Sequence, residues 1–184
     1  MQAARRLYDR LLEIVSAILM AGLTIIIVMG FVFRAIDLSL VWYDEIASIG
    51  LCWLTYYGSA LAALRGAHIG FPGIVNAFPP GLRVAATLFA EAVIIAFFAV
   101  LAVTGLEVVE ILKGSTLVSL PGISLQVTQS VIPITAVLFI LAEFLRLPEV
   151  LAAARGAGFE DHELKEALET VEATPAQPLP GGRS

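Results

Sequence analysis

The stretch IVSAILMAGLTIIIVMGFVF at residues 14–33 decides the fold, because it runs for twenty residues without a charge. A helix rising about 1.5 Å per residue needs roughly 20 apolar residues to cross a bilayer. Arg5, Arg6 and Arg10 precede the stretch, as in a signal peptide. It is longer, however, than the usual apolar signal region of about 7–15 residues, and no small-residue cleavage site follows. We therefore expect a retained transmembrane helix.

Three further stretches of spanning length follow, at residues 42–64, 84–112 and 127–147. The chain is 59% hydrophobic and only 15% charged, and its mean hydropathy is +0.90. Soluble domains are about 25% charged, so this balance belongs to membrane proteins. The sequence predicts an all-α membrane protein of four transmembrane helices with short loops, over residues 1–150. Pro133 falls inside the fourth stretch and should kink it.

Residues 151–184 differ in character and are predicted to form a cytoplasmic tail. Residues 159–171 are rich in acids and carry apolar residues broadly on one side of a helix, which favours a short acidic helix. The last eleven residues, 174–184, are rich in Pro and Gly and should be disordered.

The distribution of Lys and Arg predicts the orientation. Cytoplasmic segments are enriched in these residues, which is the positive-inside rule. With the N-terminus inside, only Arg34 and Lys113 lie on the opposite side. Nine then lie inside: Arg5, Arg6, Arg10, Arg65, Arg83, Arg146, Arg155, Lys165 and Arg183. Both termini are therefore expected in the cytoplasm.

Charged residues near the ends of the spans are expected to pair, because a charge in hydrocarbon is costly. Glu143 and Arg146 lie three residues apart near the inner end, and Glu110 and Lys113 repeat that spacing near the outer end. Both pairs have the spacing of interfacial ion pairs whose side chains reach toward water. At the outer end, Arg34 should lie at the depth of the acids that open the second span, so we expect it to pair with one of them, Asp44 or Glu45.

Glu91 has no charged neighbour and sits about two turns inside the third stretch. Two readings remain open for it: a carboxylate that couples to a proton or an ion, or a hydrogen bond to a polar group on another helix or subunit. The second is favoured. The small residues Gly58, Ala62 and Gly66 repeat every four residues on the second span, a spacing that lets helices approach closely. The aromatic residues near that span suit either the membrane interface or a protein partner: Trp42, Tyr43, Trp53, Tyr56 and Tyr57.

The sequence holds no motif for catalysis, metal binding or nucleic-acid binding. It has no GxSxG, HExxH or phosphate-binding loop, and its one cysteine, Cys52, excludes an intramolecular disulfide. His68 and Asp44 should lie at opposite faces of the membrane, so they cannot form a joint site. We expect no enzyme, no metal and no cofactor.

The region between the first two spans and the end of the second resembles the DctQ family, the small membrane subunit of tripartite ATP-independent periplasmic (TRAP) transporters. The family pattern is an Arg after the first span, a Trp-x-x-Glu that opens the second, a Trp and a Gly within it, and a Gly-x-His-Ile after it. An acid common in the family after this motif is replaced here by Gly70, Phe71 and Pro72. The matching residues are Arg34, Trp42, Glu45, Trp53, Gly58, Gly66, His68 and Ile69.

The resemblance implies a scaffold subunit in a bacterial inner membrane. A periplasmic binding protein would capture an organic anion, often a carboxylate, and a large multi-span subunit would move it with sodium. Sodium coupling is then expected in the large subunit. The alternative is an autonomous four-helix channel or small transporter with Glu91 in its pathway. The candidate interface or structural residues are Arg34, Trp42, Asp44, Glu45, Trp53, Gly58, Ala62, Gly66, His68 and Glu91.

Overall fold

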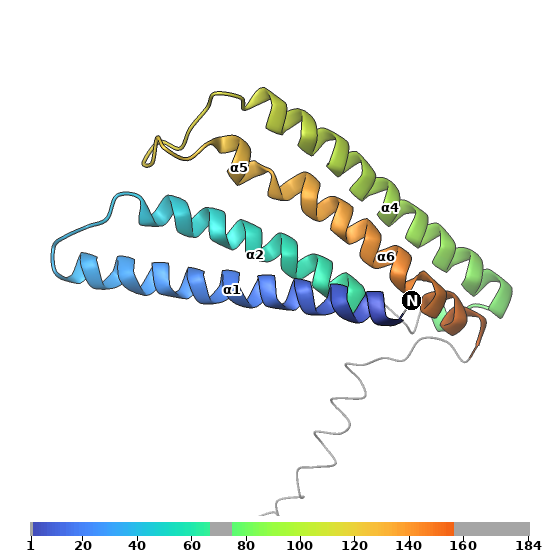
Figure 1. Ribbon diagram of the computed structural model, residues 1–184. Coiled ribbons are helices and arrows are strands. Elements are labelled where there is room, and N and C mark those ends of the chain that lie inside the picture. Colours follow the sequence, from blue (N-terminus) through green and yellow to red (C-terminus); the bar gives the residue numbers. More distant parts are fainter. Residues whose placement is uncertain (1, 67–74, 157–184) are drawn as a thin grey trace, which may run out of the picture.

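The computed structural model describes residues 2–66 and 75–156, and this part of the chain is built from helices. Four of its helices, counting α5 and α6 as one unit, are long and apolar enough to cross a membrane, as the sequence predicts. The helices are α1 (Gln2–Ala35), α2 (Tyr43–Arg65), α4 (Pro80–Ile111), the short α5 (Leu125–Gln129) and α6 (Val131–Arg155), as Figure 1 shows.

The helices extend beyond the apolar stretches that predict them. α1 begins twelve residues before Ile14, and α6 continues through Pro148 to Arg155 instead of ending near Leu147. The expected effect of Pro133 appears as an interruption at Ser130 between α5 and α6. Proline has no N–H, so it cannot continue the hydrogen-bond ladder to the carbonyl four residues earlier.

The spanning helices lie side by side in one row, in the order α1, α2, α6, α4 (Figure 1). α6 packs against α4 on one side and α2 on the other, and α2 packs against α1. α1 and α2 are antiparallel, and so are α4 and α6, whereas α2 and α6 run parallel to each other. The start of α1 lies beside the end of α6, where Arg5 pairs with Glu149. We call this end, which holds Arg5, Arg65, Arg83 and Arg155, the basic end. The opposite end, with residues 36–42 and 112–124, is the loop end.

The buried core lies where α1, α2 and α6 converge toward the basic end. The ring of Phe139 stacks on Phe98 of α4, with the ring centroids 3.7 Å apart. In contrast, large apolar side chains on the outside of α1 and α4, such as Phe31 and Phe89, are more than 70% exposed. Such surfaces suit lipid or another membrane protein. The core cluster is Leu12, Ala60, Ala63, Leu64, Phe139 and Ala142.

Two predictions concern residues outside the described ranges. They are the position of His68 and the tail after residue 156, including its short acidic helix and the Pro/Gly-rich end.

Candidate partner interface and its polar anchors

At the loop end, Glu45 fixes the connection between α4 and α5. Its carboxylate accepts hydrogen bonds from the backbone N–H groups of Val118, at 3.3 Å, and Ser119, at 2.9 Å, and from the Ser119 hydroxyl. The predicted pair with Arg34 is therefore wrong for Glu45. Asp44 does not supply the alternative, because neither acid forms an ion pair with Arg34 within residues 2–66 and 75–156.

Trp53, eight residues after Glu45 on α2, makes a further contact within the chain. Its indole N–H donates to the carbonyl oxygen of Thr128 at 2.9 Å, which ties α2 to α5, and its ring lies 6.4 Å from that of Tyr57. Trp53 thus forms its hydrogen bond within the chain, whereas the sequence alone left open whether it contacts the membrane interface or a protein partner. Tyr43 is also used internally, since a Cβ on Gly30 would collide with its ring. Trp42 precedes α2 and is half-exposed.

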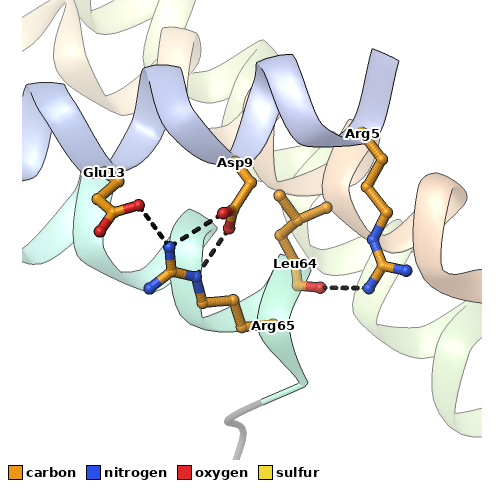
Figure 2. Close-up of polar contacts among 5 residues, drawn as sticks. All are labelled: Arg5, Asp9, Glu13, Leu64 and Arg65. Atoms are coloured by element: carbon orange, nitrogen blue, oxygen red, sulfur yellow. Dashed lines mark hydrogen bonds and ion pairs between the residues drawn. The ribbon is translucent and has the colours of Figure 1, made fainter. Parts of the chain in front are cut away.

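At the basic end, Arg65 joins α2 to α1 (Figure 2). Its guanidinium donates to both carboxylate oxygens of Asp9, at 2.7 and 3.0 Å, and to Glu13 at 2.8 Å. Asp9 and Glu13 lie four residues apart, on one face of α1. Sequence reasoning missed both acids, although that spacing beside a basic helix end was the available signal.

Arg5 makes a second bridge at the basic end. It donates to the carbonyl oxygen of Leu64 at 3.3 Å (Figure 2) and forms an ion pair with Glu149 of α6. Nearby, the Tyr8 hydroxyl donates to the Leu138 carbonyl at 2.6 Å. The start of α1 is thus bound to both α2 and α6.

The small-residue stripe on α2 divides into two parts. Gly66 ends the helix in the left-handed conformation, with φ of 72°, and a Cβ there would lie 3.0 Å from the Arg146 guanidinium. At Gly58, by contrast, nothing in the described part of the chain beyond the local helix backbone lies within 4 Å of an added Cβ, and Ala62 is half-buried. The described helices pack through Ala60 and Ala63 instead. The Gly58 part of the stripe therefore faces away from the neighbouring helices.

Glu91 and Glu143 meet between α4 and α6. Glu91 is 9% exposed and Glu143 is 2% exposed, and the two carboxyl groups lie within hydrogen-bonding reach of each other. Glu91 thus contacts a polar group on another helix, as favoured from the sequence. Glu143 is a buried group, so its prediction as a water-reaching interfacial residue is wrong. The matching prediction at the loop end is confirmed, since Lys113 forms an ion pair with Glu110.

The sequence of the chain matches the family described as "Tripartite ATP-independent periplasmic transporters, DctQ component", over residues 23–153. That match covers more than two thirds of the chain and includes all of α2 and α4, nearly all of the α5–α6 span and the last part of α1, from Leu23 to Ala35. The chain belongs to the DctQ family. It is therefore a component of a TRAP transporter and a multi-pass protein of the inner membrane. No curated protein matched the sequence.

The DctQ match separates the polar contacts into two groups. The Glu45 contacts, the Trp53 bond and the Glu91–Glu143 pair lie wholly within the matched residues. Arg65 also lies within them, but its partners Asp9 and Glu13 precede residue 23. The basic-end bridges to α1 thus lie partly outside the region shared with the DctQ family.

Proposed function

We propose that the chain is the small scaffold subunit of a sodium-coupled, binding-protein-dependent TRAP transporter for organic anions, chiefly carboxylates. In this proposal it associates with the large permease subunit, which carries the sodium coupling, and a periplasmic binding protein delivers the substrate. The observation that carries the proposal is the DctQ match over residues 23–153, which includes three spans almost entirely and the end of the first.

The row of helices supports a scaffold more than a channel. A single row does not close around a central path, and Glu91 is turned into the seam between α4 and α6. The autonomous channel requires Glu91 beside a pathway, so the structure offers it no support. A row also leaves two broad apolar surfaces, and lipid need cover only one of them.

We further propose that the basic end faces the cytoplasm. It holds Arg5, Arg65, Arg83 and Arg155, whereas Arg34 lies at the loop end and Lys113 there is paired with Glu110. The positive-inside rule then places both chain ends in the cytoplasm. A reporter that is active only in the periplasm, fused after residue 184, should stay inactive, and strong activity would reverse this orientation.

The function is tested by purifying a tagged form of the chain from its native host. We expect a large multi-span protein to copurify with the wild type. Recovery of the chain only as a self-associated oligomer would contradict the subunit proposal.

The same purification tests whether the open face of α2 contacts that partner. Among the described residues no atom lies within 4 Å of a Cβ placed at Gly58, so Gly58→Leu fills an open surface of α2, and Gly22→Leu does the same on α1. Close helix contacts in membranes depend on small residues. We expect Gly58→Leu to reduce recovery of the large protein and Gly22→Leu to leave it unchanged. Equal recovery would remove this face as the contact.

A further inference from the structure

Arg83 is a buried arginine at the basic end, and it forms no ion pair with any acid among the described residues. The residue is 9% exposed, and its guanidinium donates to the backbone carbonyl oxygens of Asn76 at 3.0 Å, Phe78 at 3.4 Å and Gly156 at 3.3 Å. Its Nε atom is also buried and has no acceptor in this part of the chain. Arg83 thus joins the turn before α4 to the last described residue of α6 through neutral acceptors alone.

The charge of Arg83 calls for a negative charge nearby. A guanidinium does not lose its proton in a protein, so burial cannot make Arg83 neutral. A buried charge is costly unless it is paired. The carbonyl groups at the end of α6 carry only partial negative charge, so they offset part of this cost. A carboxylate is therefore expected close to Arg83.

The acids of the described residues do not supply that carboxylate. Glu91 lies eight residues beyond Arg83 on α4, about 12 Å along the helix axis, and Glu143 lies thirteen residues before Gly156 on α6, about 20 Å along its axis. The three acids on the outside of the basic end already form ion pairs with other arginines: Asp9 and Glu13 with Arg65 (Figure 2), and Glu149 with Arg5.

The sequence beyond Gly156 contains the remaining acids. Outside the described ranges, residues 67–74 hold no Asp or Glu. Glu160 follows Gly156 by four residues, and four residues of extended chain span about 13–14 Å. Since Gly156 itself contacts Arg83, the first of these acids can reach Arg83. We call residues 160–172 the acidic segment; its six acids are Glu160, Asp161, Glu163, Glu166, Glu169 and Glu172.

Two exposed arginines extend the positive surface around Arg83. Arg155 directly precedes Gly156, and Arg10 follows Asp9 on α1. Both are exposed, and neither forms an ion pair among the described residues. Residues 157–184 carry the six acids against one lysine and one arginine, so their net charge is negative. The basic end and the acidic segment are therefore complementary in charge.

We propose that the acidic segment docks on the basic end of its own chain. Glu160 and Asp161 supply the counter-charge of Arg83, and the later acids bind Arg155 and Arg10. The short connection from Gly156 holds the segment at this surface at an effective concentration on the order of millimolar, which favours it over free anions. The docked segment covers these arginines against lipid phosphate and acidic partners. This inference concerns the chain itself and does not depend on the transport role.

Pulsed electron paramagnetic resonance on the full chain in phosphatidylcholine nanodiscs tests the docking. Spin labels on cysteines placed at the exposed Ala152 and at Ala167, with Cys52 changed to Ser, report the distance from the end of α6 to the acidic segment. We expect a narrow distance distribution at low salt that broadens at high salt, which screens exposed charges. A broad distribution at low salt, in a chain shown to be folded by circular dichroism, would overturn the proposal, because a free segment samples many distances.

Charge variants identify the groups that hold the segment. Arg83→Gln should broaden the distribution, and so should Arg10→Gln/Arg155→Gln, which changes exposed side chains only and tests the proposal even if Arg83→Gln does not fold. Arg34→Gln at the loop end is the control and should leave the distribution narrow. A narrow distribution that survives neutralisation of all six acids would overturn the proposal. That variant carries Glu160→Gln, Asp161→Asn, Glu163→Gln, Glu166→Gln, Glu169→Gln and Glu172→Gln.

Two further measurements separate the acidic segment from other occupants of the basic end. Nanodiscs that also contain phosphatidylglycerol offer anionic headgroups to the same arginines, and docking predicts that the distribution stays narrow. Broadening by this lipid would overturn the proposal and assign the arginines to lipid phosphate. A mixture of chains labelled singly, at Ala152 or at Ala167, should give no narrow distribution. A narrow one would overturn docking within one chain and place the segment on a second copy.

Discussion

The seam between α4 and α6 and the seam between α1 and α2 join antiparallel helices by different means. The first has an aromatic stack, a close approach at Gly105 and a buried pair of acids. The second has side-chain ion pairs from Arg65 that remain partly exposed at the basic end. Burial is uneven among the spans: 39% of the most apolar window of the α5–α6 span is buried, against 11% for α2 and 6% for both α1 and α4.

The difference indicates which helices form the stable centre of the chain. Lipid is as apolar as a leucine side chain, so helices in a membrane are held by close packing and polar contacts more than by the removal of apolar surface from water. The α4–α6 seam is rich in such contacts within the membrane. The polar contacts of α1 with α2 and α6 are concentrated at the basic end, so α1 should be the helix most readily displaced.

The largest expected effect comes from Phe139→Ala. Phe139 is 4% exposed and stacks on Phe98, and truncation of a buried Phe lowers the free energy of unfolding by about 3–5 kcal/mol in soluble cores. We expect a loss at or somewhat below this range, measured by reversible unfolding with SDS in mixed micelles. Phe144→Ala is the control, because Phe144 is 55% exposed on the same helix. Equal losses would mean that the stack does not hold the seam.

Gly105→Leu should come next. A Cβ at this position would lie 3.0 Å from the side chains of Ile132 and Pro133 and 3.2 Å from the Pro133 backbone nitrogen. Overpacking of this kind costs about 1–3 kcal/mol, and the same unfolding experiment should detect it. A Cβ at Gly22 on α1 has no neighbouring atom of residues 2–66 and 75–156 within 4 Å, so Gly22→Leu should be tolerated. A Gly105→Leu variant as stable as the wild type would show that α4 and α6 are not in close contact here.

Asp9→Asn should have a smaller effect on the α1–α2 seam. It removes one of the two acids on Arg65, whose side chain is 45% exposed, and partly exposed ion pairs contribute about 0.2–1 kcal/mol. The loss should disappear at high salt, which screens exposed charges. Glu107→Gln serves as a control, because Glu107 is exposed and its side chain forms no hydrogen bond or ion pair among the described residues. A salt-independent loss would indicate a contribution other than charge.

Glu45→Ala should have the smallest effect on unfolding and a local effect at the loop end. The backbone N–H groups of Val118 and Ser119 lose their acceptor, so their hydrogen exchange should accelerate. Asp44→Ala changes the neighbouring acid, which is exposed and accepts no hydrogen bond from this loop among the described residues, and it should leave exchange unchanged. Identical exchange in both variants would contradict the assigned bonds.

The sequence predicted the spans because their length and lack of charge are local properties. It placed the four membrane-crossing segments, the Glu110–Lys113 pair and a polar partner for Glu91 on another helix. The ends were less well predicted, because helices continue into polar sequence when tertiary contacts hold them. α1 begins well before Ile14, where Arg5 and Asp9 contact α2 and α6.

Which side chains pair between different helices could not be predicted from the spacing of residues along one helix. Arg34 and Glu45 suit each other in charge and depth, yet Glu45 turns to the backbone of the loop that follows α4, 73 residues along the chain. Glu143 has an arginine at helical spacing, yet it faces Glu91. Both choices depend on the row order of α1, α2, α6 and α4, which no single segment encodes.

The claim that the chain is one subunit of a larger transporter is tested most directly by uptake into proteoliposomes. Isotope-labelled mono- and dicarboxylates would be offered under an inward sodium gradient. The vesicles would hold the chain alone, or the chain with its copurified large subunit and the soluble binding protein outside. We predict uptake only in the complete system. Sodium-driven uptake by the chain alone would contradict the account.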